Sequence, residues 1–229
     1  IYTSGMSADD KYAAAKAAAL GFFEAAGYTV ENGKITAAPE GAKMQYEVQI
    51  PADGTGNHPA FMMVTEAKKA LAEIGMDIVV TDLSDATALW DGIRARQVDM
   101  WCAAWSATPD PDMYQVYYAD VADFNGDMGN GFNPQGGHDQ GNSSYMYCIA
   151  DEELDNMIME ARKSLDQSYR KTLYKACLDT IVDWATEVPV YQRQNAIIFS
   201  TERVKMETVP PDITTFYGWL NGIENMELN

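Results

Sequence analysis

The first half of the chain shows two hydrophobic periods in alternation. Apolar runs rich in β-branched or aromatic residues predict three strands, at 44–50, 76–83 and 98–105. Between them, apolar residues at helical spacing predict helices at about 59–74 and 85–96. The order of strand, helix, strand, helix and strand, with short connections, indicates parallel strands joined by right-handed crossovers.

Turn and cap residues mark the ends of the neighbouring elements. Ser7 is the expected N-cap of an alanine-rich helix at about 9–26, with Asp10 reaching back to it. The pair Asn32-Gly33 predicts a tight turn between two short strands. Asn57 is the expected N-cap of the helix that follows. These signals place a helix and a small hairpin before the three strands.

The second half of the chain is less regular. Residues 119–147 are rich in Gly, Asn and Asp, which predicts a long loop region. Helices are predicted at about 151–163 and 167–186, and residues 188–200 are expected to be extended. Residues 201–229 form an irregular tail that contains a late aromatic cluster.

The predicted strand at 98–105 is the part of the pattern that bears most on function. Its residues are apolar at both alternating sets of positions, as in a strand that is covered on both faces. Trp105 ends it, and the loop that follows contains Thr108 and Asp110 beside two prolines. Ligands bind at the carboxyl ends of strands in open α/β sheets, so this loop predicts a site for a small polar molecule.

Composition narrows the class of ligand and partner. The 229 residues include 34 Asp and Glu against 16 Lys and Arg, for a formal net charge of -18. Such a charge argues against nucleic acid or anionic lipid as a partner. No apolar run approaches the roughly 18 residues of a membrane span. The three cysteines are an odd number and do not form a disulfide framework.

Metal and catalytic signals are weak. Residues 123–129 resemble the first half of a calcium loop, but Met128 stands where the glycine is required and Pro134 where the glutamate is required. The two histidines, His58 and His138, are too few for a convincing zinc site. The chain has no Gly-x-Ser-x-Gly elbow. We therefore expect no metal, no cofactor and no enzymatic activity.

Several short segments follow one another in a set order. They are 22–28 (FFEAAGY), 67–77 (AKKALAEIGMD), Trp90 before Gly92, 105–111 (WSATPDP), 150–155 (ADEELD), 169–174 (YRKTLY) and 187–191 (EVPVY). This set resembles the C-terminal lobe of the peptide-type solute-binding proteins of ABC importers, the family 5 receptors for oligopeptides, dipeptides and nickel. The resemblance covers about residues 9 to 200.

The resemblance implies a fold and an organisation. The expected fold class is α/β, a periplasmic-binding-protein type II lobe whose mixed sheet carries helices on both faces. Residues 1–8 would be a linker from an N-terminal lobe, residues 9–195 the ligand-binding lobe, and residues 196–229 a segment returning toward the other lobe. The receptor would be a monomer outside the cell or in the periplasm, anchored through that N-terminal lobe, and would capture short peptides for an ABC permease.

The same resemblance implies a set of binding residues in the loop after the tryptophan-bearing strand, which lines the cleft in this family, and in two later segments. The candidates are Trp105, Ser106, Ala107, Thr108, Asp110, Asp112, Asn142, Tyr145, Tyr191 and Arg193. Peptide receptors of the family carry an aspartate three residues after the tryptophan, which pairs with the peptide's α-amino group. Thr108 occupies that position here, so Asp110 or Asp112 is the expected substitute.

Each candidate also has an interpretation without a ligand. Trp105 could fill the core, and Asp110 and Asp112 could form turns beside proline. Asn142 and Tyr145 could belong to an ordinary loop, while Tyr191 and Arg193 could lie at a hinge or on an exposed strand edge.

Three other functions also stay open: a receptor for an oligosaccharide or metal chelate, an interaction module without a solute site, and a hydrolase that depends on His138.

Overall fold

The structure is a computed structural model of the 229-residue chain. It describes residues 1–51, 54–95, 97–106, 108–119, 121, 146–192, 194, 196–214 and 216–229. The chain divides into two units, residues 1–104 and residues 105–229, and each is described by itself.

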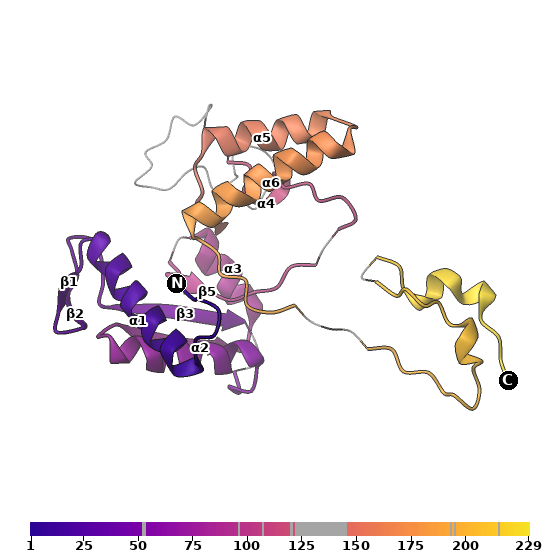
Figure 1. The fold of residues 1–229 in the computed structure, drawn as a ribbon, viewed down its shortest axis with the longest axis horizontal. Coiled ribbons are helices and arrows are strands. Elements are labelled where there is room, and N and C mark those ends of the chain that lie inside the picture. Colours follow the sequence, from indigo (N-terminus) through magenta and orange to yellow (C-terminus); the bar gives the residue numbers. More distant parts are fainter. Residues whose placement is uncertain are drawn as a thin grey trace. The chain divides into compact units, whose positions relative to one another are not determined.

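A parallel three-stranded sheet forms the centre of the first unit (Figure 1). Its strands are β3 (Gln45–Pro51), β4 (Asp77–Leu83) and β5 (Met100–Trp101), with β3 in the middle. Both neighbours of β3 run parallel to it, and Val48 stands opposite Val80 on one side and Met100 on the other. Helices α2 (Pro59–Glu73) and α3 (Ala86–Arg94) connect the strands, which confirms the predicted order.

Helices cover the two faces of this sheet because side chains alternate along β3. Val48 and Ile50 are buried in one core with Ala60, the first alanine of α2. Trp101 stands opposite Gln49 and therefore on the other face, where its ring meets Trp90 of α3 edge to face at 5.9 Å. The mixed α/β architecture with helices on both faces is thus confirmed.

Strand β5 is much shorter than the predicted strand at 98–105. The amide of Cys102 still donates to the carbonyl of Gln49 at 2.9 Å. The next bond of a parallel ladder would come from the N–H of residue 51, but Pro51 has none. Residues 102–106 consequently lie in neither helix nor strand.

A helix and a hairpin precede the sheet. Helix α1 (Ala8–Ala25) begins where Ser7 accepts the amide of Asp10, and strands β1 (Thr29–Glu31) and β2 (Lys34–Ala37) pair antiparallel across Asn32-Gly33. The expected turn is confirmed, with positive φ at both residues. A second apolar core joins these elements to α2, and its buried members are Tyr28, Ile35, Ile74 and Met76. The cap of α2 is His58, one residue after the expected Asn57.

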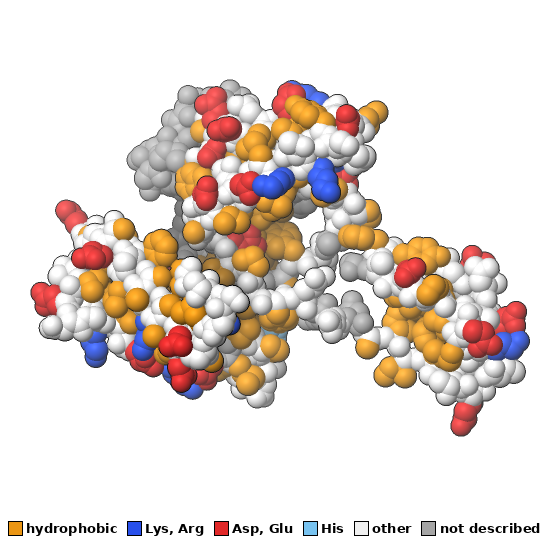
Figure 2. Space-filling model, in the orientation of Figure 1, with side chains coloured by type: hydrophobic (Ala, Val, Ile, Leu, Met, Phe, Trp, Pro, Cys, Tyr) orange, Lys and Arg blue, Asp and Glu red, His pale blue; other side chains and the backbone are white. Residues whose placement is uncertain are grey.

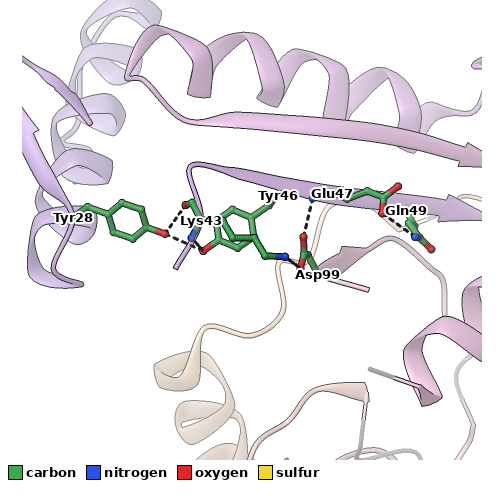
Figure 3. Close-up of polar contacts among 6 residues, drawn as sticks. All are labelled: Tyr28, Lys43, Tyr46, Glu47, Gln49 and Asp99. Atoms are coloured by element: carbon green, nitrogen blue, oxygen red, sulfur yellow. Dashed lines mark hydrogen bonds and ion pairs between the residues drawn. The ribbon is translucent and has the colours of Figure 1, made fainter. Parts of the chain in front are cut away.

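A polar cluster ties the amino ends of β3 and β5 together (Figure 3). The carboxylate of Asp99 pairs with Lys43 Nζ at 2.6 Å and accepts the amide of Glu47 at 3.2 Å. The pairing lowers the pKa of Asp99. Next to it, the phenol oxygens of Tyr28 and Tyr46 lie 2.9 Å apart. The cluster has internal partners throughout and serves to register the strands.

A helical hairpin dominates the second unit. After the short helix α4 (Tyr114–Tyr117), helices α5 (Glu152–Lys163) and α6 (Gln167–Trp184) pack against each other (Figure 1). Their N-caps are Asp151 and Asp166, whose carboxylates accept backbone amides. The residues they bury are Leu154, Asp155, Ile158, Ala161, Tyr174, Cys177 and Ile181. Both predicted helices are confirmed to within two residues.

The last residues form a small irregular substructure, here called the terminal module (residues 199–229). An isolated bridge pairs Val204 with Leu228, and the rings of Phe199 and Trp219 meet edge to face at 5.8 Å. Two 3₁₀ helices, η4 (Met206–Thr208) and η5 (Trp219–Asn225), complete it. No helix among the described residues is long and apolar enough to cross a bilayer.

Candidate functional site

Trp105 begins the second unit, four residues after the end of β5. Its side chain is 49% exposed, which is high for so large an apolar ring. The indole Nε1 donates a hydrogen bond of 2.5 Å to the phenol oxygen of Tyr147, which is itself buried. One edge of the indole is therefore fixed, and part of its surface stays accessible to a ligand.

Tyr147 belongs to a longer series of aromatic groups. Its ring lies 5.3 Å from that of Tyr117, centroid to centroid, at an interplanar angle of 35°. The hydroxyl of Tyr117 donates to Glu187 Oε2 at 2.7 Å. Trp105, Tyr147 and Tyr117, here called the aromatic row, thus run from an exposed indole to a carboxylate.

The two phenols of the aromatic row stay protonated at neutral pH. Burial raises the pKa of Tyr147 to about 12, and the negative charge of Glu187 adds to the effect. Burial and the hydrogen bond to Glu187 likewise raise the pKa of Tyr117. The row therefore consists of neutral groups, and Glu187 supplies its charge.

The loop after Trp105 is attached to α6 through Asp110. Its carboxylate Oδ1 lies 2.8 Å from Arg170 Nη2, and the Arg170 side chain is only 14% exposed. Arg170 also donates to the hydroxyl of Tyr174 at 3.2 Å. Within the loop, Thr108 Oγ1 donates to the carbonyl of Asp110 at 2.8 Å. Thr108, which occupies the position of the expected carboxylate, thus uses its hydroxyl in a hydrogen bond within the loop itself.

Asp112 attaches the same loop to α5. Its Oδ2 lies 3.2 Å from Arg162 Nε, and its Oδ1 accepts the amide of Tyr114 at 3.1 Å. The guanidinium of Arg162 also lies over the ring of Tyr114, 4.1 Å from its centroid. Two arginines on two helices therefore hold the two aspartates of the loop, which fixes the loop that carries Trp105.

A buried carboxylate anchors the chain that leaves α4. Asp155 in α5 is 6% exposed, and its two oxygens accept the amides of Ala119 and Val121, each at 2.8 Å. This contact holds the segment that follows Tyr117. Asp155 was not among the predicted site residues, because a carboxylate on the apolar face of a predicted helix resembles an ordinary polar interruption.

The structure brings some of the predicted site residues together. Trp105, Ser106, Thr108, Asp110 and Asp112 share one stretch of chain that is anchored as described. Tyr191 is exposed and lies four residues after Glu187. Ala107, Asn142, Tyr145 and Arg193 lie outside the described residues, as do His138 and the calcium-like segment 123–129. Contact of any of these residues with a ligand stays a prediction.

Several residues of this site were not predicted from the sequence. No role was predicted for four of them, namely Tyr117, Tyr147, Arg162 and Arg170. The closely spaced tyrosines between Tyr114 and Tyr118 were a usable signal for an aromatic group in this part of the chain. Glu187 stood in the quoted segment EVPVY but was not singled out. No group of three or more His, Cys, Asp or Glu that could hold a metal ion occurs in the described part of the chain.

Comparison with known proteins adds the fold class. No protein-family model and no curated protein matches the chain. Among solved structures, the oligopeptide-binding protein AppA from Bacillus subtilis, in complex with a nonapeptide, has a TM-score of 0.54 at 14% identity, covering 74% of this chain and 30% of its own. NikZ from Campylobacter jejuni, in complex with Ni(L-His), has a TM-score of 0.52 at 18% identity, covering 75% and 30%.

A third structure extends the set. The oligopeptide-binding protein from Thermus thermophilus, complexed with a pentapeptide, has a TM-score of 0.52 at 15% identity, covering 72% of this chain and 26% of its own. The chain thus spans less than a third of the length of these structures. Its fold matches one part of each of these three structures, which confirms the fold that the resemblance implied.

Proposed function

We propose that the chain is one lobe of the solute-binding component of an ABC importer, which captures short peptides between two lobes without changing them chemically. The observation that carries the proposal is Trp105, a half-exposed indole held by Tyr147 where the chain leaves the sheet. Two of the similar structures hold a nonapeptide and a pentapeptide, which supports a peptide as the ligand.

The anchored loop explains how such a lobe would recognise a peptide. A ligand that stacks on Trp105 gains most when the ring is already immobile, because little conformational entropy is then lost on binding. The Asp110–Arg170 and Asp112–Arg162 pairs supply that immobility. We propose that Ser106, Ala107 and Thr108 offer further peptide-binding groups. Closure of a second lobe would then complete the contacts.

The remaining expected contacts belong to the same proposal. Asn142, Tyr145, Tyr191 and Arg193 would add amide, phenol and guanidinium groups from two further segments. Asp110 and Asp112 would contact the ligand only while keeping their arginine partners. The receptor would act as a monomer, deliver its ligand to a permease, and work in the periplasm or outside the cell, anchored through its N-terminal lobe.

The terminal module supports the proposed organisation, with residues 1–8 as linker, 9–195 as ligand-binding lobe and 196–229 as the returning segment. Its visible surface carries orange, apolar patches in Figure 2. Exposed members include Phe216, Leu220, Ile223 and Leu228. Contiguous exposed apolar side chains mark surfaces that bind another protein part. A second lobe is the partner that this proposal assigns to them.

Peptide binding can be measured on the chain directly through the indole N–H signals of its five tryptophans in an NMR titration. We expect tri- to pentapeptides to shift the Trp105 signal, assigned with Trp105→Phe, with an affinity on the order of millimolar because closure of a second lobe is lacking. Shifts from nickel–histidine or an oligosaccharide, with none from peptides, would contradict the choice of ligand. No shift from any solute would favour an interaction module.

A further inference from the structure

A carboxylate attracts an organic cation most strongly when its own charge is not already neutralised by another cation. The loop aspartates fail this condition, because Asp110 pairs with Arg170 and Asp112 pairs with Arg162. Asp112 also uses its second oxygen on the amide of Tyr114. Each pair is close to neutral as a unit, so the loop presents little net negative charge beside Trp105.

Glu187 meets the condition. Its partner among the described residues is the neutral hydroxyl of Tyr117, which donates to Oε2 at 2.7 Å. No Lys or Arg of the described chain forms an ion pair with it. The phenol orients the carboxylate without cancelling its charge, and Oε1 keeps its capacity to accept a second donor.

The aromatic row places π-systems next to this carboxylate. Tyr117 touches both Glu187, through its hydroxyl, and Tyr147, through its ring. Glu187 is close enough to Tyr147 for its charge to act on that phenol as well. An ammonium or guanidinium group is attracted both to a carboxylate and to the face of an aromatic ring. The two attractions reinforce each other when they converge on one cation.

We propose that Glu187, oriented by Tyr117 and flanked by the aromatic row, binds a positively charged nitrogen group of the ligand. This assignment rests on the proposed function and adds the recognition element that Thr108 cannot supply. The shared chemistry is an alkylammonium or guanidinium, which a peptide carries either at its amino terminus or on a Lys or Arg side chain. Tyr117 is a positioning residue, since it acts through the carboxylate.

The test compares three trialanine-based peptides in the NMR titration. One has a free amino terminus, one is N-acetylated, and one is N-acetylated with a lysine at its second position. Glu187→Gln keeps the shape of the side chain and its hydrogen bond from Tyr117 while removing the charge. Asp183→Asn is the matched control, because Asp183 is an exposed carboxylate four residues earlier and the substitution removes the same charge.

We expect Glu187→Gln to weaken binding of the peptides that carry the recognised cation by about tenfold or more, as for loss of a charged hydrogen-bond partner. Binding of the acetylated peptide without lysine should change by less than about twofold, and Asp183→Asn should have little effect on any peptide. Tyr117→Phe should give a smaller loss of about threefold with the same peptide preference. Comparing the free-amine peptide with the lysine peptide shows whether the recognised cation is the amino terminus or a side chain.

Three outcomes overturn the assignment. If peptides bind but acetylation, lysine and Glu187→Gln leave affinity unchanged, Glu187 does not bind a cation, and the proposed function survives. Equal weakening by Asp183→Asn and Glu187→Gln would mean that only the overall negative charge matters. If no peptide binds the unaltered chain, the proposed function fails and this assignment fails with it. Thermal unfolding of each variant shows that the fold is retained.

Discussion

The indole N–H of Trp105 donates to the phenol oxygen of Tyr147 at 2.5 Å, across 42 residues of sequence. A ring that is 49% exposed is thereby held at one edge by a buried partner. An exposed aromatic ring without such a partner would sample several rotamers, and a ligand would lose binding free energy by selecting one. The hydrogen bond therefore links the packing of this unit to its proposed function.

Replacing Trp105 tests that link. Trp105→Ala should weaken peptide binding by about tenfold or more, since stacking area and the fixed edge are both lost. Trp105→Phe should give a smaller loss, because the phenyl ring still stacks but cannot donate to Tyr147. Isothermal titration or NMR measures the affinities. Unchanged affinity in Trp105→Ala would show that the peptide does not stack on Trp105 and would contradict its place in the site.

Asp155 should be among the most sensitive carboxylates to substitution. Asp155→Asn replaces one of two acceptor oxygens with an NH₂ group facing a buried amide, and should lower the free energy of unfolding by about 1.5–3 kcal/mol. Asp179→Asn disrupts only an exposed ion pair with Lys175, so it should change the free energy of unfolding by less than about 0.5 kcal/mol. Urea denaturation measures both. Equal effects would mean that the anchor at residues 119–121 contributes little.

Gly75 cannot carry a side chain. Its φ is 92°, and an added Cβ would lie inside the contact distance of the Ile35 carbonyl, because β2 donates from Ile35 N to Ile74 O at 2.7 Å. Gly75→Ala should destabilise the protein by about 3 kcal/mol or more, combining left-handed strain with the clash.

Gly21 gives the matched control for Gly75. It lies inside α1 with nothing within 4 Å of an added Cβ, so Gly21→Ala should stabilise the protein by about 0.5–1 kcal/mol. In thermal unfolding, we expect Gly75→Ala to lower the melting temperature and Gly21→Ala to raise it. A tolerated Gly75→Ala would show that the hairpin can move away from α2.

The Asp99–Lys43 pair predicts a pH dependence of stability. The folded-state pKa of Asp99 is lowered from its usual 3.8, chiefly by the hydrogen bond from Lys43. Its contribution is therefore fully present above about pH 4–5 and is lost as pH falls through the lowered value. The stability difference between the unaltered protein and Asp99→Asn should shrink below about pH 4. A stability difference that stays constant from about pH 6 to pH 3 would contradict a lowered pKa of Asp99 in the folded protein.

The local signals in the sequence were strong enough to predict most helices and strands. Ser7, Asn32-Gly33 and the helical spacing of α5 and α6 each determine conformation within a few residues, and the structure agrees with them. The strand at 98–105 was predicted too long. Its composition favours a strand, but its pairing depends on Pro51, a residue on another strand whose missing N–H ends the ladder.

The features of the candidate site likewise fall into two groups, those that the sequence predicted and those that only the structure revealed. The sequence by itself determined the α/β order and the negative charge, and it predicted Trp105 as the last residue of a strand, whereas β5 ends at Trp101. Only the tertiary structure decided that Asp110 and Asp112 meet Arg170 and Arg162. It also decided that the partner of Glu187 among the described residues is a neutral phenol. The physical reason is that a carboxylate's availability depends on which charge lies within a few ångströms of it, and these partners come from distant parts of the sequence.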